Sequence, residues 1–344
     1  MSRAIAEIFC EKDCLVLKIQ KKDFGSYTLK AFQDGEEIAA IQSEQAELPF
    51  SLDFKQSQPL TFVLKTDRET IPCGFRLLPI AGMYNVRDLG GYVNQTGKRT
   101  KWHLLYRGDQ LANLKPEGAD MLKSLNLKTV IDFRNPEEIL KSPNLLPGSV
   151  TSTINRVPAA GTAVFAGLLQ AQDSLGDRDT LVKNIKKILA KDPQAAQNAM
   201  IQQQLDFVLN PDSQKVFGQV IRDFMNAQDA PFFFHCRGGK DRTGFVAMVL
   251  LGLLGVERET LVYDYMLTGV ARSDKNKLYL ARYRTLTQDE ACATYLYSFF
   301  EVRPEYIEAA IDAIEEAGGF EAYGRQAYGL NDQDLEVLKQ IYLE

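Results

Sequence analysis

One short segment limits the folds open to this chain more than any other. The apolar run from Phe232 to His235 leads directly into Cys236-Arg-Gly-Gly-Lys-Asp-Arg-Thr-Gly244, and a strongly apolar stretch follows as far as Val256. A short apolar run bounded by turn residues predicts a buried strand, whereas the longer stretch is typical of a buried helix. The segment therefore predicts a strand, a tight loop and a helix, which together indicate an α/β layered fold.

The loop between this strand and this helix has the composition of an anion site. Gly238 and Gly239 let the backbone curl so that successive N–H groups face one point. A helix that begins near Thr243 adds free N–H groups and the positive end of its dipole. Arg242 adds a planar fork that matches two phosphate oxygens. We therefore expect a phosphate to be bound by Arg237, Gly238, Gly239, Lys240 and Arg242.

A phosphate in this loop would meet the thiol of Cys236. The positive surroundings favour the thiolate, which is the nucleophilic form of cysteine. We expect in-line attack on phosphorus to give a phosphocysteine intermediate, with Thr243 donating a hydrogen bond to the sulfur when it leaves. His235, at the end of the strand, is expected to support the loop through backbone hydrogen bonds and not to act as a general base.

The proton donor for the leaving group stays open at this point. A tyrosine or inositol oxygen leaves poorly as an anion, so the reaction needs an acid. Asp241 lies inside the loop, and Asp132 lies near the end of a predicted strand that could neighbour the catalytic strand. We favour Asp241. Its alternative role is to brace the loop, and the alternative role of Asp132 is a salt bridge to Arg134 or Arg107.

Other charged residues are expected around the loop. Lys240 would place a second positive charge at its rim, or else would only balance Asp241. Arg87, Asp88 and Arg107 are expected to form a buried ion-pair scaffold that supports the loop, with direct contact to the substrate as the alternative.

The loop resembles that of the bacterial tyrosine phosphatases that include the secreted mycobacterial and Listeria enzymes, whose signature is HCxxGKDRTG. Further stretches are similar to elements of that family: Asn85–Tyr92, Tyr106–Leu111 with Gly108 in place of the usual serine, Asp132–Arg134, Asp264-Tyr265 and Val302–Tyr306. The resemblance implies a central sheet flanked by helices and hydrolysis of phosphotyrosine. It also implies possible breadth toward phosphoserine, phosphothreonine or phosphoinositides, the last associated with lysines like Lys240.

Two other readings of the loop are weaker. A rhodanese-like sulfurtransferase also carries a cysteine loop after a strand, but usually lacks the Arg-Thr-Gly entry into an apolar helix. A phosphate-reading module without turnover is disfavoured by the intact Cys236 and Arg242. A nucleotide-binding Walker loop is excluded because Asp241 stands where serine or threonine is needed.

The rest of the chain suggests two domains. Short alternating runs in residues 1–76 are punctuated by turn residues about every ten positions, which predicts a small β-sandwich-like extension of unknown role. Residues 77–344 alternate between strands and helices and form the expected phosphatase domain. Within it, residues from about 159 to 204 predict a helical insertion, which is either a lid over the site or an ordinary surface insertion.

Composition excludes several classes of function. The net charge of −5 argues against nonspecific nucleic-acid binding. The five cysteines are irregularly spaced, so neither a disulfide framework nor a metal site is expected. The N-terminus lacks the apolar core of a signal peptide, and the longest apolar run is too short to cross a bilayer. We expect a cytoplasmic enzyme without a cofactor, acting on phosphorylated proteins or phosphoinositides, with export by a signal-free route still open.

Overall fold

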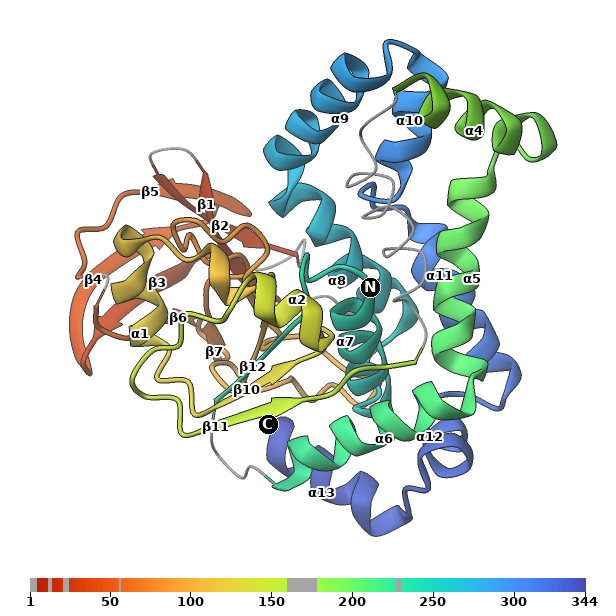
Figure 1. Ribbon diagram of the computed structural model, residues 1–344. Coiled ribbons are helices and arrows are strands. Elements are labelled where there is room, and N and C mark those ends of the chain that lie inside the picture. Colours follow the sequence, from red (N-terminus) through yellow and green to blue (C-terminus); the bar gives the residue numbers. More distant parts are fainter. Residues whose placement is uncertain (1–4, 12–13, 21–24, 56, 160–177, 227–230) are drawn as a thin grey trace.

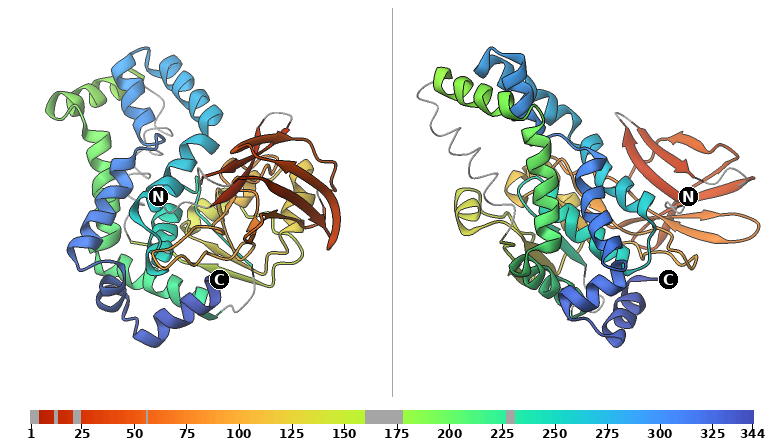
Figure 2. Two further views of the ribbon diagram at one scale, coloured as in Figure 1. Left: turned by 180° about the vertical axis from the view of Figure 1, so that it is seen from behind. Right: turned by 90° about the vertical axis from the view of Figure 1, so that its right-hand side faces the viewer.

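The computed structural model describes residues 5–11, 14–20, 25–55, 57–159, 178–226 and 231–344. It combines an N-terminal all-β part with a larger α/β part, as the sequence predicts (Figure 1). The β part and the helices α4, α5, α9 and α10 lie on opposite sides of the molecule (Figures 1 and 2).

The N-terminal part contains two antiparallel sheets. The first has the order β1-β2-β5, formed by Ala6–Glu11, Cys14–Ile19 and Glu47–Phe50. The second has the order β4-β3-β6-β7, formed by Glu36–Ser43, Tyr27–Gln33, Leu60–Lys65 and Thr70–Cys73. Alternating side chains of β3 are buried, which is the pattern of a sheet with one covered face.

The central sheet has the order β11-β10-β12-β9-β8, formed by Ser152–Asn155, Thr129–Asp132, Phe232–His235, Leu105–Gly108 and Arg87–Asp88. The first four strands are parallel and β8 is antiparallel. The register places Asp132 and Gly108 beside His235, one on each side. The carboxyl ends of three parallel strands therefore meet at the position where the cysteine loop begins, which is where α/β sheets bind ligands.

Helix α7 runs from Asp241 to Leu253 and is buried along almost its whole length. It begins two residues before the predicted Thr243, because the carbonyl of Lys240 already accepts the N–H of Gly244 at 2.8 Å. The other helices are α1 (Ala119–Ser124), α2 (Pro136–Lys141), α4 (Arg178–Lys191), α5 (Ala195–Leu209), α6 (Pro211–Asn226), α8 (Arg258–Ala271), α9 (Ser273–Thr287), α10 (Glu290–Ser298), α11 (Pro304–Glu316), α12 (Phe320–Tyr328) and α13 (Asp332–Tyr342).

Two hydrophobic cores meet at the central sheet. Phe232 and Phe234 of β12 face the core around α7, whereas Phe233 faces the opposite way. On that second side, Phe233 belongs to one cluster with residues of the β part such as Phe62 and Leu64. The expected division near residue 76 thus runs through a shared core, and the β part covers one face of the sheet. A third, smaller cluster joins α4, α9 and α10.

Part of the expected insertion around 159–204 lies outside the described residues, which omit 160–177. The described remainder forms α4 and the first part of α5. Among the residues that the structure describes, no helix combines the length and the apolar character needed to cross a membrane.

Candidate active site

The cysteine loop joins the end of β12 to the start of α7 at the carboxyl edge of the sheet. Gly239 has a φ of +65°, in the left-handed region that favours glycine. A Cβ atom at Gly239 would lie 2.4 Å from the carbonyl oxygen of Gly108, which is closer than any real contact. Both the turn and the close approach of the neighbouring strand therefore require glycine here.

Side chains from outside the loop hold its carbonyl oxygens. The Asn85 amide donates to the carbonyls of Gly238 and Gly239, at 3.1 and 3.0 Å. Arg107 Nη2 donates to Gly239 O at 2.8 Å, and Arg272 Nη1 donates to Gly238 O at 3.1 Å. Carbonyls fixed in this way leave the opposite, N–H side of a curled loop to face an anion.

A buried carboxylate, Asp264 on α8, organises the supporting arginines. Its Oδ1 accepts from Arg87 Nε at 2.9 Å, and its Oδ2 accepts from Arg107 Nη1 at 2.5 Å. Burial alone would raise the pKa of Asp264, but Arg87 and Arg107 hold it well below its usual range. Asp88, expected in the same ion-pair group, instead accepts the backbone N–H groups of Gly90 and His103, each at 2.8 Å.

Arg242 is clamped by a carboxylate that the sequence analysis did not identify. Glu138 on α2 accepts Nη1 and Nη2 of Arg242 at 2.9 and 3.0 Å, and the carbonyl of Phe133 accepts Nη1 at 2.8 Å. Burial would raise the pKa of Glu138, but its hydrogen bonds with Arg242 lower it. Such a two-point pair fixes the plane of a guanidinium group.

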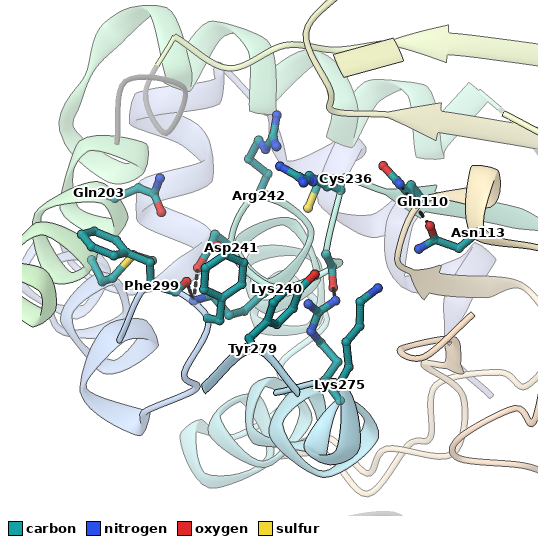
Figure 3. A pocket seen from close by; sticks show the side chains of 15 residues that line it. Gln110, Asn113, Gln203, Cys236, Lys240, Asp241, Arg242, Lys275, Tyr279 and Phe299 are labelled. Carbon is teal, nitrogen blue, oxygen red and sulfur yellow. Dashed lines mark hydrogen bonds and ion pairs between the residues drawn. The ribbon is translucent and has the colours of Figure 1, made fainter. Parts of the chain in front are cut away.

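These elements surround a cavity of about 250 Å³, with Cys236 4 % exposed among its lining residues. Figure 3 shows the Cys236 sulfur beside Arg242, with Tyr279 and Lys275 rising toward it from α9. The basic residues that line the cavity are Arg237, Lys240, Arg242, Arg272 and Lys275, and the acidic one is Asp241. Tyr279, Phe299 and Phe300 supply aromatic surface. The cavity thus combines strong positive charge with a wall suited to an aromatic ring.

The two candidate acids lie in different surroundings. Asp241 lines the cavity, and its Oδ1 lies 3.6 Å from Lys240 Nζ. Asp132 is 1 % exposed and pairs with Arg134 at 2.8 Å, one of the two partners that the sequence allowed. Although burial would raise the pKa of Asp132, His235 and Arg134 lower it, so its ionised form is favoured. The structure therefore brings Asp241, and not Asp132, to the cavity.

The remaining loop residues have distinct contacts. Lys240 Nζ donates to the carbonyls of Phe299 and Glu301, at 2.7 and 3.0 Å, so it also fastens the connection between α10 and α11. Burial lowers the pKa of Lys240. Thr243 is fully buried, and its hydroxyl has no hydrogen-bond partner among the described residues. His235 Nδ1 lies 3.1 Å from the carbonyl oxygen of Cys236, and burial lowers its pKa.

Three charged contributors to the site, Glu138, Arg272 and Lys275, were not predicted from the sequence. Glu138 completes a capping box with Asn135. The Asn-x-x-Glu spacing could have predicted that helix start, but not that the carboxylate also binds Arg242. Arg272 and Lys275 lie at the junction of α8 and α9, and no pattern marks them. Across the described ranges, no group of three or more His, Cys, Asp or Glu side chains is placed to hold a metal ion.

Comparison with known proteins agrees with this geometry. Residues 78–344 match the model of the tyrosine phosphatase family. A Cupriavidus necator protein named "Putative tyrosine-protein phosphatase" is 30 % identical over 75 % of this chain and 85 % of its own length. The "Triple specificity protein phosphatase PtpB" of Mycobacterium tuberculosis is 25 % identical over 77 % of this chain and 98 % of its own. A Nostoc commune "Tyrosine-protein phosphatase" is 28 % identical over 47 % of each chain. The chain belongs to the tyrosine phosphatase family.

Proposed function

We propose that this protein hydrolyses phosphotyrosine through a phosphocysteine intermediate on Cys236. The observation that carries the proposal is the position of Cys236 in a cavity whose loop, arginine and helix start all favour a bound dianion. A phosphate held by the loop N–H groups and by Arg242 would present its phosphorus to the sulfur. The aromatic wall formed by Tyr279, Phe299 and Phe300 suits the ring of a phosphotyrosine.

The chemistry takes two steps. In the first, the Cys236 thiolate forms a bond to phosphorus while the bond from phosphorus to the tyrosine oxygen breaks, and Asp241 gives its proton to that oxygen. In the second, Asp241 accepts a proton from water as the water oxygen attacks phosphorus. The bond between phosphorus and sulfur then breaks, and inorganic phosphate leaves with the thiolate restored. The loop and Arg242 stabilise the equatorial oxygens in both steps.

The test is phosphate release from p-nitrophenyl phosphate and a phosphotyrosine peptide in the presence of a metal chelator. We expect activity that vanadate inhibits and that Cys236→Ser abolishes. Cys10→Ser is the matched control, because Cys10 is exposed and belongs to the β part. Turnover that survives Cys236→Ser, or that needs a divalent metal, would refute the proposal. Turnover of thiosulfate and cyanide would favour the sulfurtransferase alternative.

Breadth of substrate is part of the proposal. The name of the mycobacterial relative states triple specificity, and five basic residues line this cavity against one acidic residue. We infer that phosphoserine, phosphothreonine or phosphoinositides are further substrates. A panel of these compounds with the parent protein and Cys236→Ser tests this, and release from phosphotyrosine alone would restrict the function to tyrosine. A cytoplasmic location stays a prediction.

A further inference from the structure

The β part places a buried carboxylate against the phosphatase part. Glu7, on β1, is fully buried, and its Oε1 accepts from Arg76 Nε. Its Oε2 accepts from the hydroxyl of Tyr263 on α8 at 3.0 Å. Glu7 and Arg76 both precede the family match, which begins at residue 78. The residues before the family match therefore contribute a buried carboxylate, and both of its oxygens accept hydrogen bonds.

One series of contacts connects Glu7 to the cysteine loop through Arg76. The guanidinium of Arg76 donates to the carbonyl oxygens of Asp88 and Gly90, the latter at 2.7 Å. It also stacks on the ring of Tyr92, 4.0 Å from its centroid. The Tyr92 hydroxyl in turn donates to Asp264 Oδ1 at 3.1 Å. Arg76 thus fixes the segment that positions both Arg87 and Tyr92.

A second path is shorter and arrives at the same carboxylate. Tyr263, which donates to Glu7, immediately precedes Asp264 on α8. Asp264 binds Arg107, and Arg107 Nη2 donates to the loop carbonyl of Gly239 at 2.8 Å. Both paths from Glu7 therefore converge on Asp264 and from there reach the loop that holds the phosphate.

We propose that Glu7 is a positioning residue for the phosphate loop, so that the β part belongs to the catalytic apparatus. The inference rests on the proposed phosphatase function. The physical reason is that a carboxylate without access to water binds its donors strongly and in one geometry. Replacing it with an amide keeps the shape but removes the charge that orients Arg76. The segment that carries Arg87 would then be held less firmly in position. The resulting displacement would be transmitted through Asp264 to the phosphate-binding loop.

The experiment uses the full chain with Glu7→Gln and, as a milder change, Tyr263→Phe. The matched control is Glu37→Gln, which breaks an ion pair of the same β part, with Lys30 at 2.7 Å, but in an exposed position. Steady-state kinetics with p-nitrophenyl phosphate and competitive inhibition by inorganic phosphate are measured at a temperature where circular dichroism shows every variant folded. Asn85→Ala, alone and combined with Glu7→Gln, completes a double-mutant cycle.

We expect Glu7→Gln to lower kcat roughly tenfold, with a parallel rise in the Kd of phosphate, because small errors in positioning are costly in catalysis. Tyr263→Phe should lower kcat about threefold by the same reasoning, and Glu37→Gln should leave it unchanged. The effects of Glu7→Gln and Asn85→Ala should be less than additive. A folded Glu7→Gln protein with the parent's kcat, or strictly additive effects, would overturn the proposal. If Glu7→Gln does not fold, the same criteria apply to Tyr263→Phe. An inactive parent protein would refute the phosphatase function instead.

Discussion

Glu138 holds Arg242 at two points, with N–O distances of 2.9 and 3.0 Å. Because Arg242 is the fork that would bind two phosphate oxygens, its plane must be set before the substrate arrives. We predict that Glu138→Gln lowers kcat with p-nitrophenyl phosphate about tenfold, since the amide keeps the shape but loses the charge-assisted pair. Glu137→Gln, an exposed neighbour on the same helix, should have no effect. Equal kcat values for these two variants would argue against the clamp.

The identity of the proton donor can be read from the leaving group. p-Nitrophenolate leaves readily without a proton, whereas an alkyl oxygen does not. Asp241→Asn should therefore lower kcat roughly 10²-fold with an alkyl phosphate and far less with p-nitrophenyl phosphate. Asp132→Asn should lower activity toward both substrates by the same factor, because Asp132 pairs with Arg134 away from the cavity. A dependence on the leaving group in Asp132→Asn, and none in Asp241→Asn, would reverse the assignment.

The residues of the site that could be predicted from the sequence are close to one another along the chain. The strand, the loop and the apolar helix from Phe232 to Val256 follow from periodicity and glycine placement, and the structure has them with a helix that begins two residues earlier. Cys236, Asp241 and Arg242 line one cavity because they lie at the two ends of one short loop between β12 and α7. The placement of such residues can be predicted without knowing the rest of the fold.

The part that could not be predicted depends on contacts between distant segments. Glu138 reaches Arg242 across 104 positions of the sequence, and Arg272 reaches Gly238 from the end of α8. Helices such as α2, which is short, and α9, whose apolar residues are irregularly spaced, are not marked by periodicity either. Whether a charge lies at the surface, in a scaffold or in a cavity is decided by packing, which periodicity does not describe.

A substitution of Lys275 tests the role of the basic residues that line the cavity. It lines the cavity, and burial together with the neighbouring Arg272 lowers its pKa. Among the described residues it has no ion pair with a carboxylate, and its ammonium lies over the ring of Tyr84. We predict that Lys275→Met raises KM for an acidic phosphopeptide about fivefold with little change in kcat, because it removes uniform binding of an anion. Lys277→Met, an exposed position on the same helix, is the control. A loss confined to kcat would contradict this role.

The Asp264 cluster predicts how stability depends on pH. Its pKa in the folded protein lies below the ordinary value of 3.8, because Arg87 and Arg107 outweigh the effect of burial. In acid the unfolded chain therefore binds a proton before the folded protein does. The stabilisation is complete above pH 3.8 and is lost as the pH falls below that value toward the lowered folded pKa. Urea unfolding at pH 7 and at several pH values below 3.8 measures this loss.

The variant Asp264→Asn isolates this contribution. It should lower the free energy of unfolding at pH 7 by about 3–5 kcal/mol, because it leaves Arg87 and Arg107 buried without a counter-charge. It should also show a smaller loss of stability in acid than the parent, since the titrating group is gone. Asp274→Asn, an exposed carboxylate 3.0 Å from Lys277, should keep the parent's pH dependence. An Asp264→Asn protein with the same dependence as the parent would mean that Asp264 does not contribute to stability through its ionisation.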